Sequence, residues 1–391
     1  MTEPAAGRVA LATIAREWAR IGIIGFGGPP AHVALLRKLC VDNRGWLPAH
    51  EFEDGVAATN LLPGPASTQL AIFCAWRLRG LAGALLGGVC FIVPGLVIIL
   101  ALAALFLART VPALVLGAAA GAGAAVPAVA VKAAVGLAPA SWNRAGPDRL
   151  AGARWIAYLV AGGAAAAVIG PFLVIVLLGC GLIEVAARFP GAPRSGGQRP
   201  GAVALLAAPA AATAGLGAVA WVAFKVGALS YGGGFVIVPL MQHDAVITYH
   251  WMTGAQFLSA VALGQITPGP VVLTVAVVGY AAAGLRGGLL ATLVAFAPSF
   301  VFVIAGAPHF GKLRASRRVQ SFLTGAGPAA IGAIAGAAIP LSAELSHLWQ
   351  AGVGVAAAAW LLALRKGVVS ALLGAAAIGV IAALAGAPVS H

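Results

Sequence analysis

Two Pro-Gly-Pro runs carry the residue types in this sequence that are best suited to binding a ligand. The first lies in "NLLPGPASTQ", where Pro63, Gly64 and Pro65 interrupt an apolar stretch. Proline is favoured in the first turn of a helix, so Pro65 predicts a helix start. The N–H groups of a helix start have no partner within the helix, and the helix dipole is positive there, which suits an anion. The stretch therefore predicts an anion-facing helix start.

The second run, in "GQITPGPVVLT", repeats the first at the matching place in the second half of the chain, and each run follows a glycine-rich stretch. An alternative is that the prolines only kink helices for packing, but repetition of the whole motif favours a paired site. The residues that we expect to form this site are glycines, prolines and small polar side chains: Gly27, Gly28, Asn60, Pro63, Gly64, Pro65, Ser67, Thr68, Gln69, Gly232, Gly233, Gln265, Thr267, Pro268, Gly269 and Pro270.

Cations inside apolar segments are the candidates for compensating an anion's charge. Arg20 and Lys225 fall at matched positions before the two glycine-rich stretches. A cation in a membrane helix is costly and usually faces a partner or an aqueous cavity. We therefore expect both to compensate charge, with a side chain that reaches to the membrane surface as the alternative. Lys132, alone within an apolar run, is a third cation for which the surface alternative is favoured.

His32 and Glu51 are the candidates for proton coupling. Histidine is the side chain nearest to titrating at physiological pH, and Glu51 belongs to a short acidic cluster before the first Pro-Gly-Pro run. The alternatives are a hydrogen-bonded structural histidine and a solvated acidic loop. For each residue, the sequence leaves both proton coupling and the alternative open.

The elements that position these residues must be membrane helices. The chain is 61% hydrophobic and 9% charged over 391 residues, whereas ordinary soluble domains are about 25% charged. Several apolar runs, such as 80–108, 111–131 and 285–308, reach the roughly 20 residues that cross a bilayer. This composition excludes a soluble enzyme and predicts an all-α, polytopic membrane protein with helices broken by glycine and proline.

Other classes of function lack the residues that they need. The net charge of +14 is spread between apolar runs, so no nucleic-acid partner is expected. The four cysteines show no metal-ligand spacing, so neither a metal site nor a cofactor is expected. No nucleotide-binding or hydrolase motif is present, so we expect no catalytic residues and no enzyme activity. Arg8, Arg16 and Arg20 interrupt the first apolar residues, so we expect no cleavable signal peptide.

The chain aligns with itself when its second half is laid over its first. The shared features are rare residues in register: "GIIGFGGP" at 22–29 with "GALSYGGG" at 227–234, Trp46 with Trp251, Phe52 with Phe257, and the two Pro-Gly-Pro runs. We therefore predict an N-terminal transporter repeat at 1–190, a linker with a connecting membrane segment at 191–217, and a C-terminal repeat at 218–391.

The distribution of basic residues predicts how the repeats lie in the membrane. Six segments in each half and a spanning connector give about 13, and positive residues then favour a cytoplasmic N-terminus and a second half that is inverted. Among the predicted segments, 12–36 and 53–75 include the Gly-Gly-Pro and Pro-Gly-Pro breaks. Because several segments are short or interrupted by glycine, re-entrant helices are an alternative to full crossings. Inverted repeats are the architecture of many secondary transporters.

Two long stretches resemble the chromate ion transporter (CHR) family in its long-chain, two-domain form. They are "FGGPPAHVALLRK" with "RGWLPAHEFEDGVAATNLLPGPASTQLA", and "YGGGFVIVPLMQHDAV" with "WMTGAQFLSAVALGQITPGP". The resemblance implies a multi-pass protein of the cell inner membrane that exports chromate, driven by proton motive force or by exchange with sulfate. It maps the family's motif residues to Gly27, Gly28, Pro29, His32, Trp46, Phe52, Pro63, Gly64, Pro65, Gln69, Gly232, Gly233, Trp251, Pro268, Gly269 and Pro270.

The sequence leaves other interpretations open. A transporter of sulfate or another oxyanion with the same fold and a passive anion channel both remain alternatives, because chromate and sulfate share charge and shape. The second half has Gly234 and Ile237 where the first has Pro29 and His32, so the halves need not contribute equally. The expected partners are chromate, with sulfate as an alternative, and the lipid bilayer; a homodimer is left open.

Overall fold

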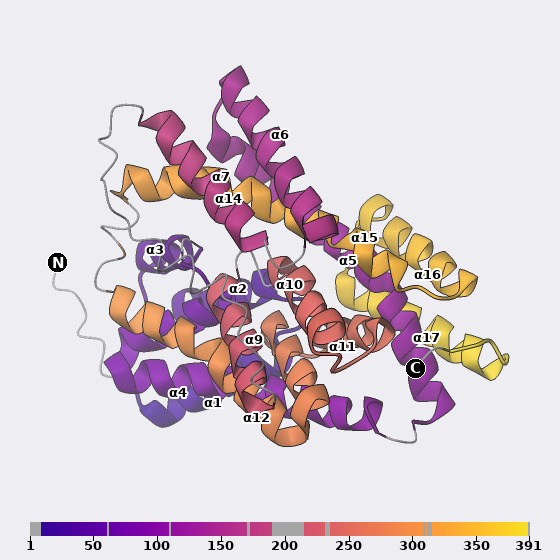
Figure 1. The fold of residues 1–391 in the computed structure, drawn as a ribbon. Helices are drawn as coiled ribbons and strands as arrows, with labels where there is room; N and C mark the ends of the chain where they lie inside the picture. The colour runs from indigo at the N-terminus through magenta and orange to yellow at the C-terminus, as the bar shows by residue number, and fades with distance from the viewer. Residues whose placement is uncertain are drawn as a thin grey trace.

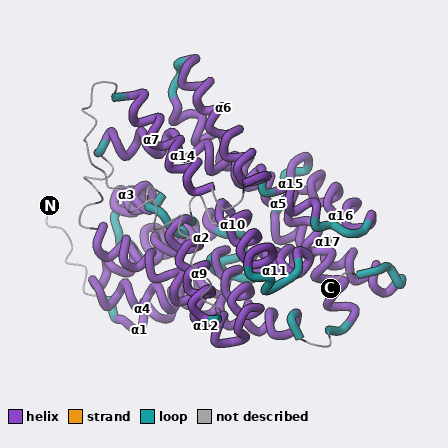
Figure 2. Tube along the Cα trace, viewed as in Figure 1, coloured by secondary structure: helices purple, strands orange, loops and turns teal. Residues whose placement is uncertain are grey.

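The chain folds into packed helices, and its described part contains no strand (Figures 1 and 2). The computed structural model describes residues 9–60, 62–108, 111–169, 173–189, 215–230, 235–307, 310 and 315–389. The predicted linker and connecting segment therefore lie outside the described residues except for 215–217. The all-helical class predicted from the sequence is confirmed.

Helices of the first half are α1 (Leu11–Ile24), α2 (Pro29–Arg37), α3 (Ala49–Thr59), α4 (Ala66–Phe106), α5 (Ala113–Ala145), α6 (Arg149–Ala164) and α7 (Leu173–Arg188). Those of the second half are α9 (Leu216–Leu229), α10 (Val238–Gln242), α11 (Gly254–Ile266), α12 (Thr274–Gly306), α14 (Arg317–Gly336), α15 (Ala338–Ala343), α16 (Leu348–Ala358) and α17 (Val368–Leu384). Short π-helical and 3-10 turns, labelled η, join several of them.

Within the described residues, five helices are long and apolar enough to cross a membrane. They are Ala66–Phe106, Ala113–Ala145, Arg149–Val168, Val271–Gly306 and Arg317–Ala343. Four shorter apolar helices, among them α9 and α17, pack with these. The prediction of a polytopic membrane protein is therefore confirmed.

The long helices α4 and α12 each fold back on themselves. In α4 the backbone leaves the helical region at Arg79 and Gly80, where Gly80 has a φ of 58°. Gly83 then packs against the carbonyl of Ala75, which eight residues of straight helix would hold about 12 Å away. The first arm of α4 (66–78) and its second arm (81–106) therefore form a hairpin. The same turn at Ala283 and Gly284 divides α12 into a first arm (274–282) and a second arm (285–306).

In place of single continuous helices at the predicted crossings 12–36 and 53–75, the structure has pairs of short helices joined at the glycine and proline breaks. Glu51 on α3 pairs with Arg77 on the first arm of α4 at 2.6 Å, and Gly55 packs against Phe73, so these two helices run antiparallel on either side of the Pro-Gly-Pro run. Arg44 likewise returns to within 3.5 Å of Glu17 on α1. Each helix has fewer than the roughly 20 residues needed to cross the bilayer, so the glycine and proline breaks turn the chain around.

Backbone irregularities recur at the spacing of the sequence repeat. The π-helical turns at Lys38–Asn43 (η1) and His243–Thr248 (η5) occupy matched positions in the two halves. Left-handed φ values follow each of them, at Gly45 (57°) and His250 (51°). Gly64 and Gly269, at the centres of the two Pro-Gly-Pro runs, also share positive φ values. Because such conformations are rare, their recurrence shows that the two halves share one backbone design.

The two halves contact each other reciprocally at these breaks. The N–H of Gly269 donates to the carbonyl of Gly25 at 3.1 Å, and the N–H of Gly64 donates to the carbonyl of Ser230. Gly25 and Ser230 end α1 and α9 at matched positions of the repeat, so each half gives the other the same hydrogen bond. This reciprocity is what a two-fold axis between the halves produces.

The second arms of α4 and α12 pack against each other in opposite directions. Gly88 lies against the ring of Phe300, and Gly288 lies against Leu100. The N-terminal end of each arm therefore lies beside the C-terminal part of the other, so the two arms are antiparallel. Equivalent helices that run antiparallel are the arrangement expected of an inverted repeat, which remains a prediction about the membrane.

Candidate functional site

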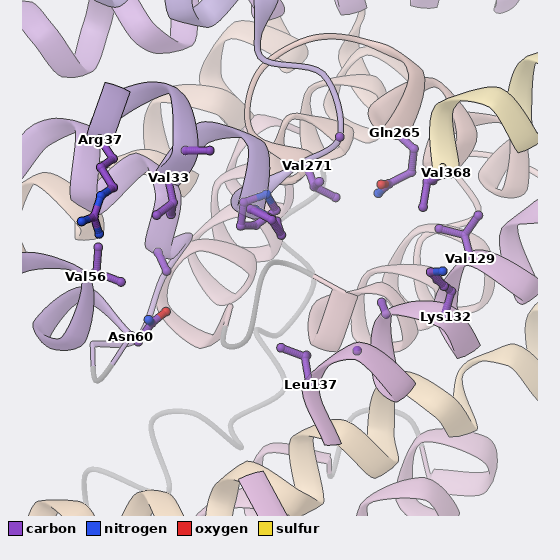
Figure 3. Close-up of a pocket in the computed structure, with 18 of the residues that line it drawn as sticks. Val33, Arg37, Val56, Asn60, Val129, Lys132, Leu137, Gln265, Val271 and Val368 are labelled. Atoms are coloured by element: carbon purple, nitrogen blue, oxygen red, sulfur yellow. The ribbon is translucent and has the colours of Figure 1, made fainter. Parts of the chain in front are cut away.

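A cavity of about 850 Å³ lies where the broken helices of both halves meet (Figure 3). Its lining is mostly apolar. It comes from α2, α3, the starts of α4 and α17, the middle of α5, the end of α11, and the turns before α2 and α12: Gly27, Gly28, Pro29, Pro30, Val33, Ala34, Arg37, Phe52, Glu53, Val56, Ala57, Asn60, Ala66, Val129, Lys132, Ala133, Gly136, Leu137, Gln265, Val271 and Val368. The predicted site residues among them are Gly27, Gly28, Asn60 and Gln265.

Lys132 places an ammonium group at the cavity from the middle of α5. Its Nζ donates to the carbonyl oxygen of Leu361 at 2.7 Å. Leu361 belongs to the π-helical turn Ala359–Ala363 (η8), a geometry that often marks functional sites. An ammonium carries three hydrogens, so two remain for a ligand. The cation is thus held in place and still able to bind.

Gln265 contributes a side-chain amide from the end of α11, three residues before the second Pro-Gly-Pro run. The residue is 8% exposed, and its Nε2 has no hydrogen-bond partner in the described part of the chain. A buried amide N–H without a partner costs about 1–3 kcal/mol. Because Gln265 lines the cavity, a ligand with an acceptor oxygen would remove that cost.

The start of α4 supplies backbone donors. Pro65 is the N-cap, and the N–H groups of Ala66, Ser67 and Thr68 lie in the first turn, where no carbonyl of the helix can reach them. Ala66 lines the cavity. Val271, the first residue after the second Pro-Gly-Pro run, does the same for the second half. Both predicted helix starts therefore reach one cavity.

The start of α2 reaches the same cavity but offers few donors. Pro29 and Pro30 occupy its first turn and have no N–H, while the N–H groups of Ala31 and His32 both bond to the carbonyl of Gly28. Gly28, with a φ of 74°, takes a conformation that other residues adopt only at a cost. The Gly-Gly-Pro run thus shapes the wall rather than donating to a ligand.

Several predicted site residues are buried near the breaks and do not line the cavity. Gln69 donates from Nε2 to the carbonyl of Pro63 at 2.6 Å, which holds the loop across the run. Thr68 is fully buried with its hydroxyl unpartnered in the described chain. The hydroxyl of Thr267 donates back to Leu263 at 2.8 Å. The predicted residues Gly232 and Gly233 lie outside the described residues.

His32 is buried between the two breaks of the first half. Its Nε2 donates to the carbonyl of Gly25 at 2.9 Å, and its Nδ1 lies 3.2 Å from the hydroxyl of Ser67. The ring also contacts Phe91 edge-on, with 5.0 Å between the ring centroids. A carbonyl accepts and a hydroxyl can donate, so both contacts fit a neutral imidazole. His32 ties the start of α4 to the end of α1 and does not line the cavity.

The predicted charge-compensating and acidic residues sit in ion pairs away from the cavity. Arg20 lies 3.6 Å from Glu17 and its side chain is 69% exposed. Lys225 pairs with Asp244 at 2.6 Å. Glu51 pairs with Arg77. Their roles in transport remain predictions, whereas Lys132, for which the sequence favoured a side chain that reaches the membrane surface, lines the cavity. Its position in the middle of an apolar run was the signal.

Besides Lys132, the charged residues of the described lining are Arg37 and Glu53, which pair with each other. The guanidinium Nη1 of Arg37 lies 3.2 Å from Oε1 of Glu53, so their charges cancel. In Figure 3, Lys132 and Gln265 lie toward one end of the cavity, and Arg37 and Asn60 lie toward the other. The uncompensated charge of the described lining is therefore the positive charge of Lys132.

An all-helical membrane protein with two halves of one design and an internal cavity at their broken helices has the fold of a membrane transporter. The family model described as chromate transporter matches residues 12–185 and again 217–384. The chain belongs to the chromate transporter family. It is thus a transporter and not an enzyme, as the sequence predicts.

Curated relatives agree with this assignment. The chain is 34% identical over 333 residues to the chromate transport protein of Cupriavidus metallidurans, covering 83% of this chain and 80% of that protein. It is 30% identical over 344 residues to the probable chromate transport protein of Synechococcus elongatus, covering 86% of each. It is 29% identical to the chromate transport protein of Pseudomonas aeruginosa over 83% of this chain and 79% of that protein. No solved structure matches the chain significantly.

Proposed function

We propose that this protein carries chromate out of the cell across the inner membrane, and that chromate binds in the cavity between the two halves. Its family and its chromate-transporting relatives support the substrate. The main support for this site is that Lys132 and Gln265, from different halves, line one cavity that the starts of two broken helices also reach.

The donors at this cavity match the chemistry of chromate. Chromate is a tetrahedral dianion whose four oxygens only accept hydrogen bonds. Two hydrogens of Lys132, the amide of Gln265 and the first N–H groups of α4 are donors without competing acceptors in the described chain. Charged hydrogen bonds are about twice as strong as neutral ones. The apolar walls keep the dielectric low and strengthen them further.

Transport follows from rocking one half against the other around this cavity. The antiparallel second arms of α4 and α12 and the reciprocal hydrogen bonds of the two Pro-Gly-Pro runs support an inverted repeat. Those two hydrogen bonds would act as a paired hinge, because each joins a break in one half to the helix end of the other. The substrate is released when this contact shifts.

The energy for export comes from proton motive force or from exchange with an anion such as sulfate. His32 and Glu51 are the groups that we propose for proton coupling, and Arg20 and Lys225 contribute positive charge from outside the cavity. His32 is suited to this role because it contacts both the end of α1, before the Gly-Gly-Pro break, and the start of α4, after the Pro-Gly-Pro break.

Flux into proteoliposomes tests this function. The purified protein is reconstituted, and uptake of radiolabelled chromate is followed with an imposed pH gradient, with an imposed membrane potential, and with internal sulfate. We expect uptake above that of empty liposomes, and stimulation by the pH gradient at a fixed membrane potential or by internal sulfate. A channel would instead pass chromate at a rate set only by its own electrochemical gradient. Chromate uptake equal to that of empty liposomes under every condition would refute the proposal.

A further inference from the structure

A second cavity of about 510 Å³ lies beside the first and is lined by arginines. Arg144 ends α5, Arg188 ends α7 and Arg317 begins α14, and the hydroxyl residues Ser321 and Thr324 complete the polar wall. These helices come from both halves of the chain. Three guanidinium groups around one space are the arrangement that binds tetrahedral oxyanions.

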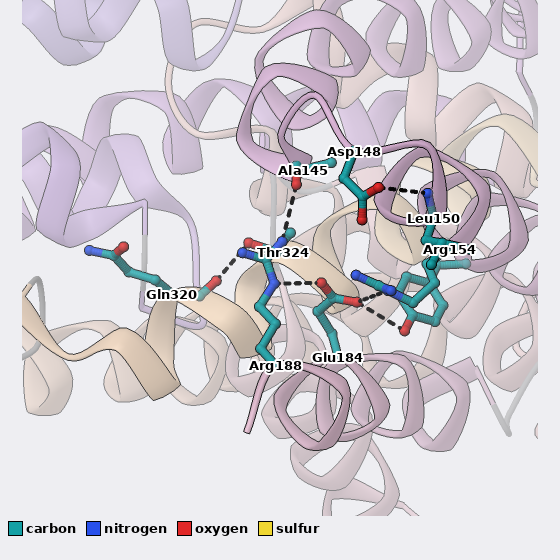
Figure 4. Close-up of polar contacts among 9 residues, drawn as sticks. Ala145, Asp148, Leu150, Arg154, Glu184, Arg188, Gln320 and Thr324 are labelled. Carbon is teal, nitrogen blue, oxygen red and sulfur yellow. Dashed lines mark hydrogen bonds and ion pairs between the residues drawn. The ribbon is translucent and has the colours of Figure 1, made fainter. Parts of the chain in front are cut away.

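Arg188 is fixed in place by a buried carboxylate (Figure 4). Glu184 is 2% exposed and accepts from Arg188 at 2.6 Å, from Arg154 at 2.9 Å and from the hydroxyl of Tyr158 at 3.2 Å. Arg188 also donates to the carbonyl of Ala145 at 3.2 Å. Its guanidinium is therefore held by two acceptors, and Glu184 shares its single negative charge between Arg188 and Arg154.

Arg144 and Arg317 have no such partner. Neither makes an ion pair with a carboxylate of the described residues, although both line the same space. Like charges that share a cavity repel each other, and a bound dianion would relieve that repulsion. Ser321, 5% exposed, adds a hydroxyl at the same wall. The second cavity is thus built for an anion that two unpaired arginines would hold.

The two cavities share part of their lining. Ala57 and Asn60, at the end of α3, line both of them. Asn60 lies at the opposite end of the first cavity from Lys132 and Gln265 in Figure 3. A ligand that leaves the arginines therefore passes Asn60 before it reaches Lys132.

We propose that the second cavity is an arginine vestibule, in which Arg144 and Arg317 capture a free, doubly charged tetrahedral oxyanion and pass it to the transport cavity. This inference rests on the proposed function, because it names the entrance of the same path. A phosphate group on an anionic lipid has related chemistry, but the lining shared through Asn60 favours an ion on its way to the cavity.

The test compares two double variants of equal charge. R144Q/R317Q removes the unpaired arginines, whereas R149Q/R318Q removes nearby arginines that are likewise exposed but line neither cavity. Initial rates of chromate transport are measured in proteoliposomes at low and high salt. For R144Q/R317Q we expect about a tenfold rise in KM at low salt, an unchanged kcat and a smaller difference at high salt, because electrostatic capture is screened. The control should change less than twofold.

An equal change in both double variants, or none in R144Q/R317Q, would overturn the vestibule. The assay is repeated in purely zwitterionic lipid and with added anionic lipid; an effect of R144Q/R317Q that appears only with anionic lipid would show that the cavity holds a lipid headgroup instead.

Equilibrium dialysis of radiolabelled chromate against the purified full chain separates this inference from the proposed function. The vestibule predicts two bound ions per chain in the wild type and one in R144Q/R317Q, whether or not the liposomes show transport. Equal stoichiometry in both proteins would refute it. Absence of flux with both ions bound would refute the transport function alone.

Discussion

Replacing Lys132 with glutamine tests the chemistry of the transport cavity most sharply. The change keeps much of the side-chain length and removes the positive charge that no carboxylate balances in the described lining. A unit charge about 4 Å from another at an effective dielectric constant near 20 contributes about 4 kcal/mol. A dianion would double that value to about 8 kcal/mol, which is a ceiling because solvent and desolvation oppose it.

Measured losses for one partner of a buried charge pair are about 2 to 5 kcal/mol. Lys132 is half-buried and already donates one hydrogen to Leu361, so the lower end applies. A loss of about 2 to 3 kcal/mol corresponds to chromate binding that is weaker by a factor of roughly 30 to 150.

Equilibrium dialysis with radiolabelled chromate measures this loss directly, and KM in proteoliposomes follows it. K132R keeps the charge and should retain most of the affinity. K366Q removes an exposed lysine that does not line the cavity and serves as the control with the same change of charge. Chromate affinity of K132Q within threefold of the wild type would show that the cation does not hold the substrate.

Three further changes follow from the structure. Q265L removes the unpartnered amide at the cavity. It should weaken chromate binding about tenfold in the same dialysis assay, because a hydrogen bond to a charged group contributes about 1.5–3 kcal/mol; unchanged affinity would remove Gln265 from the site. G64A should abolish transport, because Gly64 has a φ of 121° and an added Cβ would collide with the side chain of Gln69. The control G386A also replaces a glycine of positive φ, 76°, but its Cβ would meet no atom, so it should transport normally. Equal transport rates in the two variants would contradict a hinge at the break. E184Q leaves Arg154 and Arg188, whose side chains are 33% and 34% exposed, without their carboxylate. It should lower the thermal midpoint by a few degrees, because the lost charged hydrogen bonds cost about 1–3 kcal/mol; an unchanged midpoint would argue against the Glu184 cluster as a stabilising contact.

The breaks and the repeat were predictable from the sequence because they depend on local chemistry. Proline and glycine act at their own positions, so the helix start at Ala66 and the left-handed glycines follow directly from residue types. The spacing of the repeat likewise appears in the backbone, as the paired π-helical turns show.

The turns of the chain were not predictable in the same way. Hydropathy is the same for a segment that crosses the bilayer and for one that turns back halfway, so 12–36 and 53–75 were predicted as crossings. Only contacts between the arms, such as Glu51 with Arg77, distinguish the two cases. The fold of α4 back on itself at Gly80 is hidden for the same reason.

Which cation reaches the cavity is also a question of tertiary structure. Arg20 and Lys225 stood out because they occupy matched positions in the two halves. Each nevertheless pairs with a carboxylate, Glu17 or Asp244, that has no acidic counterpart in the other half. The repeat does not single out Lys132 in this way, and its approach to Gln265 depends on how α5 packs across the second half.

The most direct test of the proposed site is the position of the ion itself. A structure determined with chromate bound, with anomalous scattering measured at the chromium absorption edge, places the metal atom of the substrate without ambiguity. We predict a chromium peak in the cavity, placed so that the chromate oxygens accept hydrogen bonds from Lys132 and Gln265, with any second peak beside Arg144 and Arg317. Chromium bound elsewhere, with the cavity between the two halves empty, would contradict the proposed site.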